Sequence, residues 1–265
     1  MAASTTLLDW RDGELVALDD CDVAETGVEA ADSFLVAGGS VLAIGLHRTR
    51  FIESAIERGF DGRAELEAFW EAGLAAIPRG GDWFPRFESV TVRDAPRLRF
   101  RLRTAPERTG PIVVATAATD PRRAPHVKGP DLEALSRLRQ EAQHAGAQEA
   151  VILDSGRVSD GSTTALLWWR GNTLYAPPLV LPRVDSVAAR TVRGVAAALG
   201  VPVDEEAVAP AELEGCVLWA VNALHGIRAV TAWVDGPSLA QDPARTAAWR
   251  SRLQALARPL QPRVR

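Results

Sequence analysis

The sequence predicts a mixed α+β fold of two units, and three observations lead to this prediction. Short strand-like stretches outnumber clean strand–helix–strand units, which disfavours a doubly wound parallel sheet. The chain has 265 residues, enough for one large domain or two small ones at about 150 residues each. A segment rich in turn residues, 104–112, separates the two halves. We therefore expect a smaller N-terminal α+β domain over residues 1–108 and a larger C-terminal α+β domain over residues 109–265.

The first half contains strands, then two helices, then two further strands. Gly38 and Gly39 form a hairpin signal between two apolar stretches, and the helical stretch that starts at His47 stops at Gly59. Between Arg97 and Arg103, apolar residues alternate strictly with arginines, as on a strand with two unlike faces. The expected strands are 14–18, 33–37, 41–44, 87–93 and 97–103, and the expected helices are 47–59 and 64–74.

The second half alternates strands with three helices. The first two helices stop at glycines, Gly146 and Gly200, which favour the ends of helices. Gly171-Asn172 predicts a hairpin within residues 165–175. The expected strands are 113–117, 149–154, 217–221 and 230–234, and the expected helices are 132–144, 186–199 and 243–257.

Composition excludes several classes of protein. The chain is 47% hydrophobic and 24% charged, typical of a globular protein. Thirty Lys and Arg against 34 Asp and Glu give a net charge of −4, which disfavours nucleic acid as a partner. Two cysteines are too few for a disulfide framework, and the histidine spacing predicts no metal site. The sequence shows no leader peptide and no membrane-spanning run, so we expect a cytoplasmic protein that acts on a small molecule.

Lysine usage is the most unusual feature of the chain. Of the 30 Lys and Arg residues, only Lys128 is a lysine. Arginine replaces lysine on solvated surfaces, but its guanidinium stays charged and cannot attack a carbonyl. A single lysine in an arginine-rich chain is therefore a candidate for forming a Schiff base. The alternative is a solvated lysine in a surface loop.

Two further features suit a pyridoxal phosphate enzyme. Such an enzyme needs a carboxylate for the ring nitrogen, and Asp160 follows Lys128 in a turn. It also needs an anion-binding helix start, which Ser186 and the residues after it supply. The alternative for Asp160 is an ordinary turn residue before a glycine.

Four segments, in order, resemble the fold-type IV pyridoxal phosphate enzymes, which include class IV aminotransferases and aminodeoxychorismate lyase. The resemblance covers roughly residues 30–235. Leu46–Phe51 resembles the family's His-x-x-Arg-Leu motif, and His126–Lys128 resembles its lysine motif. Gly146–Gly161 resembles the stretch that runs from Gly-x-x-Glu-Ala to Glu-Gly. Asn222–Val230 resembles the segment of the lyase branch that runs from Asn-Ala-Leu to Pro-Val.

The resemblance implies a two-domain fold like that of D-amino acid aminotransferase, with pyridoxal 5′-phosphate in the cleft between domains and Lys128 in the C-terminal domain. It implies that Lys128 forms the Schiff base and shuttles protons, and that Asp160 binds the ring nitrogen. It also implies a homodimer and an amino or oxo acid substrate. The remaining implied contacts are Arg50, Ser186, Val187, Ala188, Asn222 and Ala223 for the phosphate, and Ser33 near the substrate.

The reaction predicted first is transfer of the amino group of an amino acid to a 2-oxo acid. The arginine stripe is more often a solvated face, but Arg101 or Arg103 could bind a substrate carboxylate if that face lines the site. Asn222-Ala-Leu and Leu132, where many aminotransferases have tyrosine, favour the alternative of 4-amino-4-deoxychorismate lyase. Asp160, Ala165 and Ala188 depart from the family's pattern. The third alternative is therefore a non-catalytic member of the family.

Overall fold

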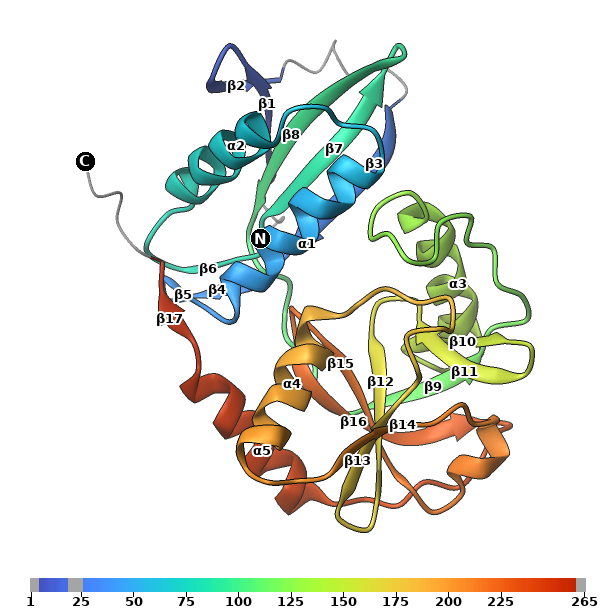
Figure 1. Ribbon diagram of the computed structural model, residues 1–265. Helices are drawn as coiled ribbons and strands as arrows, with labels where there is room; N and C mark the ends of the chain where they lie inside the picture. The colour runs from blue at the N-terminus through green and yellow to red at the C-terminus, as the bar shows by residue number, and fades with distance from the viewer. Residues whose placement is uncertain (1–4, 19–25, 261–265) are drawn as a thin grey trace. The chain divides into compact units, whose positions relative to one another are not determined.

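The computed structural model describes residues 5–18 and 26–260, which group into two compact units (Figure 1). Of the described residues, unit 1 comprises those up to Glu107, Val127–Pro130 and those from Leu256, and unit 2 comprises Arg108–His126 with Asp131–Ala255. The long segment of unit 1 ends one residue before the boundary expected at 108. The grouping assigns Lys128 to unit 1, whereas the sequence-based division places it in the C-terminal domain.

Unit 1 is a five-stranded antiparallel sheet with two helices packed on it. The strand order is β2-β1-β8-β7-β3, so β3 is an edge strand. The helices α1 (Ile44–Glu57) and α2 (Arg63–Ala76) cover the face on which Phe87 and Phe100 pair in register. The strands are β1 (Thr5–Arg11), β2 (Glu14–Ala17), β3 (Thr26–Ser33), β7 (Arg86–Val92) and β8 (Ala95–Arg103).

A small second sheet completes unit 1. Its order is β17-β5-β4-β6, and Gly38-Gly39 closes the hairpin of β4 and β5, as predicted. The predicted strand 33–37 is wrong as one element, because β3 ends at Ser33 and β4 starts at Val36. The strands of this sheet are β4 (Val36–Ala37), β5 (Ser40–Val41), β6 (Asp82–Trp83) and β17 (Arg258–Pro259).

Unit 2 is a mixed eight-stranded sheet of order β11-β10-β9-β16-β15-β12-β13-β14. The strands are β9 (Ile112–Thr116), β10 (Glu149–Asp154), β11 (Arg157–Gly161), β12 (Ala165–Arg170), β13 (Thr173–Ala176), β14 (Val203–Glu205), β15 (Val217–Asn222) and β16 (Gly226–Val234). The helices are α3 (Leu132–His144), α4 (Val187–Ala198) and α5 (Pro243–Ala255), with a short 3₁₀ helix η2 (Pro210–Leu213).

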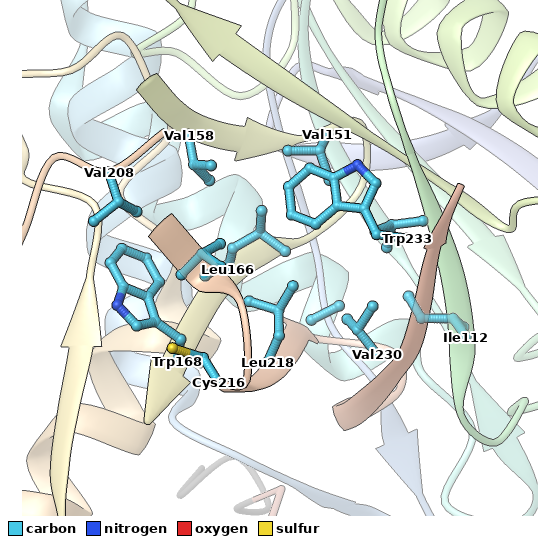
Figure 2. Close-up of a cluster of buried hydrophobic side chains, with 13 residues drawn as sticks. Ile112, Val151, Val158, Leu166, Trp168, Val208, Cys216, Leu218, Val230 and Trp233 are labelled. Carbon is cyan, nitrogen blue, oxygen red and sulfur yellow. The ribbon is translucent and has the colours of Figure 1, made fainter. Parts of the chain in front are cut away.

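The core of unit 2 depends on strand alternation, which sends neighbouring side chains to opposite faces. Trp168 lies in the cluster of Figure 2 with Leu166 and Leu218, and its ring stacks on Tyr175. Its neighbour Trp169 faces the other way and packs edge-on against tryptophans of β15 and α5. The tryptophan pair therefore belongs to the core on both faces of the sheet.

Within the described ranges, no helix is both long and apolar enough to cross a membrane. Over the same residues, His, Cys, Asp and Glu side chains form no group of three that could hold a metal ion.

Candidate active site

The main chain of Lys128 is fixed to the free edge of β3. The backbone N–H of Ala31 donates to the carbonyl oxygen of Lys128 at 2.6 Å. The next residue, Gly129, has φ +150°, and a Cβ atom there would lie 2.7 Å from Ala30 Cα and 2.9 Å from Ala31 N. Only glycine fits such close backbone contact. The single lysine of the sequence therefore lies in a loop whose main chain is anchored to strand β3.

Replacing Gly129 by alanine is expected to lower the free energy of unfolding by about 2–3 kcal/mol, since overpacking alone costs about 1–3 kcal/mol and the conformation is strained. Denaturant unfolding measures this loss. The matched control is Gly194→Ala, an exposed α4 position whose new Cβ meets nothing within 4 Å. A helical Gly-to-Ala change there is expected to stabilise by about 0.5–1 kcal/mol. Equal effects at both positions would contradict the close contact with β3.

Asp32 follows Ala31 in β3, and its carboxylate binds two side chains of α1. Its Oδ1 lies 2.7 Å from His47 Nδ1, and its Oδ2 accepts from Arg50 Nε at 2.7 Å. His47 and Arg50 are one turn apart on α1, so both reach the same carboxylate. Burial favours the neutral form, but the charge of Arg50, with His47 and both hydrogen bonds, holds the pKa of Asp32 at about 2. Asp32 is therefore ionised and fixes the plane of the Arg50 guanidinium.

His47 is the neutral member of this cluster. Burial lowers the pKa of its imidazole, and the charges of Arg50 and Lys128 add to this effect, although Asp32 opposes it. Because ionised Asp32 only accepts hydrogen bonds, the hydrogen lies on Nδ1 of His47.

The predicted substrate residues share one face of the sheet. Ser33 pairs in register with Arg86 on β7, and Arg86 pairs with Arg101 on β8. Registered pairs share a face, and Arg103 follows two positions after Arg101. Arg86 forms an ion pair with buried Glu88, and Arg101 Nε lies 3.6 Å from the same carboxylate. Positive charge therefore exceeds negative charge on this face.

The arginine stripe is not a uniformly solvated strand face. Arg99 is 3% exposed and donates through Nε to Asp9 Oδ1 at 2.8 Å. Arg103 donates through Nε to the Phe84 carbonyl at 2.8 Å. Burial, with the charges of Arg86 and Arg101, lowers the pKa of Arg103 to about 10. A guanidinium in this setting gains from an anionic partner.

In unit 2, Asp160 lies near the end of β11 and is 6% exposed. Its Oδ1 accepts from the Gly161 N–H at 3.0 Å, and its Oδ2 accepts from Val184 N at 3.2 Å and from Arg122 at 3.3 Å. Burial raises the pKa of Asp160 to about 6, although Arg122 and the two backbone N–H groups oppose the rise. A carboxylate offers about four acceptor positions, so one remains for a further donor.

Replacing Asp160 by asparagine is expected to stabilise the cofactor-free protein at neutral pH. The folded pKa of about 6 exceeds the ordinary 3.8. A raised pKa contributes stability below pH 3.8 that is lost as the pH rises through 6, about 3 kcal/mol for about two units. The difference in free energy of unfolding between Asp160→Asn and wild type is therefore expected to increase between pH 4 and 7, as measured by thermal or denaturant unfolding. Asp204→Asn, at an exposed position of β14, is the control, and parallel pH curves for wild type and Asp160→Asn would contradict the raised pKa.

The start of α4 has the chemistry of an anion site. Ser186 is its N-cap, and its Oγ accepts from the Ala189 N–H at 3.3 Å. The backbone N–H groups of Val187 and Ala188 belong to the first turn, where helix geometry gives them no intrahelical partner. These two amides, with the positive end of the helix dipole, favour a phosphate group.

Asn222 and Ala223 lie at the turn between β15 and β16. The side-chain oxygen of Asn222 accepts from Leu224 N at 3.1 Å and His225 N at 2.8 Å, and its Nδ2 donates to Thr163 O at 3.3 Å. Asn222 therefore shapes its own turn and connects it to the loop that follows β11.

Glu149, fully buried at the start of β10, anchors that same loop. It accepts from Thr163 N at 3.0 Å and from the hydroxyl groups of Ser162 and Thr163. One buried carboxylate thus holds the loop between β11 and β12, which follows Asp160 and contacts the Asn222 turn through Thr163. Glu149 belongs to the motif Gly146–Gly161, and a charge inside an apolar strand is a sequence signal of a special role.

The predicted residues fall into one set per unit. Unit 1 brings together Lys128, Arg50 and Ser33, with Arg101 and Arg103 on the arginine face. Unit 2 holds the other predicted residues, Asp160, Ser186, Val187, Ala188, Asn222 and Ala223. The sequence did not predict a role for Asp32, Arg86, Glu88 or Arg122. A carboxylate at the end of an otherwise buried strand was the one available signal for Asp32.

Comparison with known proteins identifies the family. The sequence matches the family described as amino-transferase class IV over residues 29–233, and the chain belongs to that family. No curated protein sequence gives a significant match. The predicted family and the mixed α+β, fold-type IV architecture are therefore confirmed.

Several solved structures have a fold similar to that of this chain, although their sequence identity to it is low. A fold IV transaminase, CpuTA1, from Curtobacterium pusillum is 19% identical with a TM-score of 0.80, over 95% of this chain and 97% of that one. A branched-chain aminotransferase from Thermoproteus uzoniensis, solved with norvaline, is 18% identical with a TM-score of 0.82, over 97% and 100%. A hypothetical aminotransferase from Mycobacterium tuberculosis in its PLP-bound form is 16% identical with a TM-score of 0.76, over 96% and 98%.

Proposed function

We propose that this chain is a pyridoxal phosphate-dependent enzyme that transfers the amino group of an amino acid to a 2-oxo acid. The observation that carries the proposal is the position of Lys128, the only lysine of the sequence. Its main chain is bound to β3 directly beside Asp32, which orients Arg50. The family and a PLP-bound structural neighbour support the same cofactor.

The residues present fit this cofactor by the chemistry of their donors and acceptors. Lys128 offers an amine for the aldehyde, and Asp160 has an acceptor position left for the ring nitrogen. Arg50 and the first-turn amides of α4 are phosphate-binding groups. The Asn222 turn is assigned to the phosphate as well. Asp160 replaces the glutamate of the family and keeps the carboxylate, while Ala188 keeps only its amide.

The chain's own residues divide the work as follows. Pyridoxal phosphate, when bound, supplies an aldehyde for amines and a ring that withdraws electrons. Lys128 takes and returns the proton at the substrate Cα. Asp160 accepts the hydrogen bond of the ring nitrogen and, when ionised, keeps that nitrogen protonated. Arg50 and the first-turn amides of α4 are each groups that would donate to a phosphate.

The arginine face is assigned to the substrate carboxylates. Ser33, Arg101 and Arg103 share the face on which cations outnumber Glu88. A guanidinium binds a carboxylate through paired hydrogen bonds. The burial of Arg103 strengthens such a contact, because a less solvated guanidinium loses less hydration on binding. The proposed substrates are therefore amino and oxo acids. The proposed assembly is a homodimer, and light scattering is expected to give twice the mass of the chain.

A second candidate reaction is the cleavage of 4-amino-4-deoxychorismate to 4-aminobenzoate and pyruvate. Asn222-Ala-Leu and Leu132 favour it, and so does an arginine face that suits a doubly anionic substrate. A non-catalytic member of the family is the third candidate, motivated by Asp160, Ala165 and Ala188.

Two measurements on purified protein separate the three candidates. A visible absorbance band after addition of pyridoxal phosphate, lost in Lys128→Ala, is expected for either enzyme and contradicts the non-catalytic candidate. Oxo-acid-dependent amino transfer supports the transaminase, whereas pyruvate and 4-aminobenzoate released without an oxo acid support the lyase. A protein that stays colourless would overturn the proposed function.

A further inference from the structure

Arg122 is a buried arginine of unit 2 with a fixed geometry. Its side chain is 2% exposed. Its Nε and one terminal nitrogen donate to the two carboxylate oxygens of Asp120, each at 2.8 Å, and that terminal nitrogen also donates to the Pro182 carbonyl at 2.8 Å. The other terminal nitrogen donates to Asp160 Oδ2 at 3.3 Å. Three hydrogen bonds therefore fix the guanidinium in the orientation in which it donates the fourth to Asp160.

We propose that Arg122, held by Asp120, is a positioning residue that keeps Asp160 ionised and correctly oriented for the cofactor ring. The inference rests on the proposed function, because it assigns Asp160 to the ring nitrogen. It adds a pair of residues, Asp120 and Arg122, that acts on the cofactor only through Asp160.

Burial makes this support necessary. A carboxyl group removed from water favours its neutral form, and neutral Asp160 cannot hold a ring nitrogen protonated. The charged groups that face it are Arg122, from the segment after β9, and Arg183, from the segment before α4. Arg183 is directed elsewhere, since its Nε donates to the Pro178 carbonyl at 3.3 Å. Arg122 is thus the cation in direct contact with the carboxylate, and Asp131 also influences Arg122 electrostatically.

The contact also restricts where the carboxylate can point. Arg122 and the Val184 N–H both bind Oδ2, while Oδ1 accepts, among the residues that the structure describes, from the adjacent Gly161 N–H alone. Oδ1 is therefore the oxygen with acceptor capacity for the ring nitrogen. Aspartate is one methylene shorter than the glutamate of the family, so its orientation depends more strongly on such fixed partners.

The test is the titration of Asp160 in cofactor-free protein, followed by ¹³C NMR of carboxyl-labelled aspartate. Asp160→Asn identifies the resonance. Arg122→Gln is expected to raise the midpoint by about one unit or more, since an opposite charge at contact lowers a carboxyl pKa by roughly 1–3 units. Arg122→Lys, which keeps the charge, is expected to recover part of the shift. The control is Arg123→Gln, an exposed neighbour expected to leave the midpoint unchanged.

Asp120→Asn gives a second variant, because it loosens the fork that holds Arg122 while retaining the arginine. It is expected to shift the midpoint upward by less than Arg122→Gln does. If Arg122→Gln does not fold, this smaller shift decides the question. A midpoint that stays within about 0.3 units of wild type in the variants that fold would overturn the inference.

Binding of pyridoxal phosphate separates this inference from the proposed function. Equilibrium dialysis from pH 6 to 9 is expected to give about tenfold weaker binding for Arg122→Gln at pH 7, with wild-type affinity for Arg123→Gln. Wild-type protein that fails to bind the cofactor would overturn the proposed function. Wild-type protein that binds it, with equal affinity and pH dependence in Arg122→Gln, would overturn the role of Arg122 alone.

Discussion

Replacing Lys128 by alanine is expected to abolish amino-group transfer and the visible absorbance of the protein loaded with pyridoxal phosphate. Lys128 is the only lysine of the sequence, so no other side-chain amine can take its place. Proton transfer by a positioned side chain alone contributes about 10²- to 10⁴-fold to a rate. We therefore expect the rate constant of amino-group transfer, measured in a single-turnover assay with an amino acid substrate, to fall by at least about 10³-fold.

Lys128→Arg tests whether positive charge alone suffices. Arginine keeps the charge but cannot lose its proton, so it is expected to be as inactive as alanine. His126→Ala is the matched control, because His126 is exposed and lies two positions earlier in the same loop. Denaturant unfolding of all three variants checks that folding is intact.

A chemical readout complements the kinetics. Borohydride reduction of the loaded wild-type protein, followed by peptide mapping, is expected to leave the pyridoxyl group on the peptide that contains Lys128. Activity within tenfold of wild type in Lys128→Ala, or a pyridoxyl group found only at the N-terminal amine, would contradict the assignment of Lys128.

Local patterns predicted much of the fold because they depend on nearby residues. The helix α3 spans Leu132–His144, as expected from its apolar spacing and the glycine after it. The hairpin through Gly171-Asn172 also forms as predicted. In both cases the chain's own turn chemistry determines the element, and distant residues do not change it.

Long-range pairing explains what local patterns missed. The strand β1 (Thr5–Arg11) was not predicted, and it exists through its register with β8. The same pairing places Asp9 opposite Arg99, which buries an arginine expected on a solvated face. The helix α1 starts at Ile44, three residues earlier than predicted, after Ala43 with φ 53°. Neither a remote partner nor an unusual backbone angle at alanine can be read from the local sequence.

The candidate site shows the same division. Lys128 and Asp160 stood out by residue type and motif order, whereas the side chains that orient their surroundings did not. Asp32 binds Arg50, which lies 18 residues away in the sequence, and Arg122 binds Asp160, which lies 38 residues away. Such pairs follow from strand register and loop packing, which a single sequence does not reveal.

Replacing Asp32 by asparagine is expected to cost about 3 kcal/mol of stability at pH 7 and to weaken binding of pyridoxal phosphate. The variant leaves Arg50, whose side chain is 14% exposed, without its ionised partner, and breaking a buried pair costs about 3–5 kcal/mol. Arg50 is the guanidinium assigned to the phosphate, so its loss of orientation also lowers cofactor affinity. Denaturant unfolding measures the first effect and equilibrium dialysis the second.

The matched control is Glu53→Gln on the same helix. Glu53 accepts from Arg63 at 2.8 Å, but the two side chains are 56% and 53% exposed. An exposed ion pair contributes only about 0–1 kcal/mol, so this variant is expected to unfold and to bind the cofactor like wild type. The comparison separates loss of a buried, orienting carboxylate from loss of any carboxylate on α1.

The pH dependence gives Asp32 a signature that a general packing defect lacks. Its folded pKa of about 2 lies below the ordinary 3.8. A lowered pKa contributes stability that is present above pH 3.8 and lost as the pH falls through 2, about 2.5 kcal/mol at about 1.4 kcal/mol per pKa unit. Wild type is therefore expected to lose this amount between pH 5 and 2, and Asp32→Asn is not. Unfolding curves that stay parallel over this range would show that the Asp32 carboxylate does not hold the Arg50 ion pair.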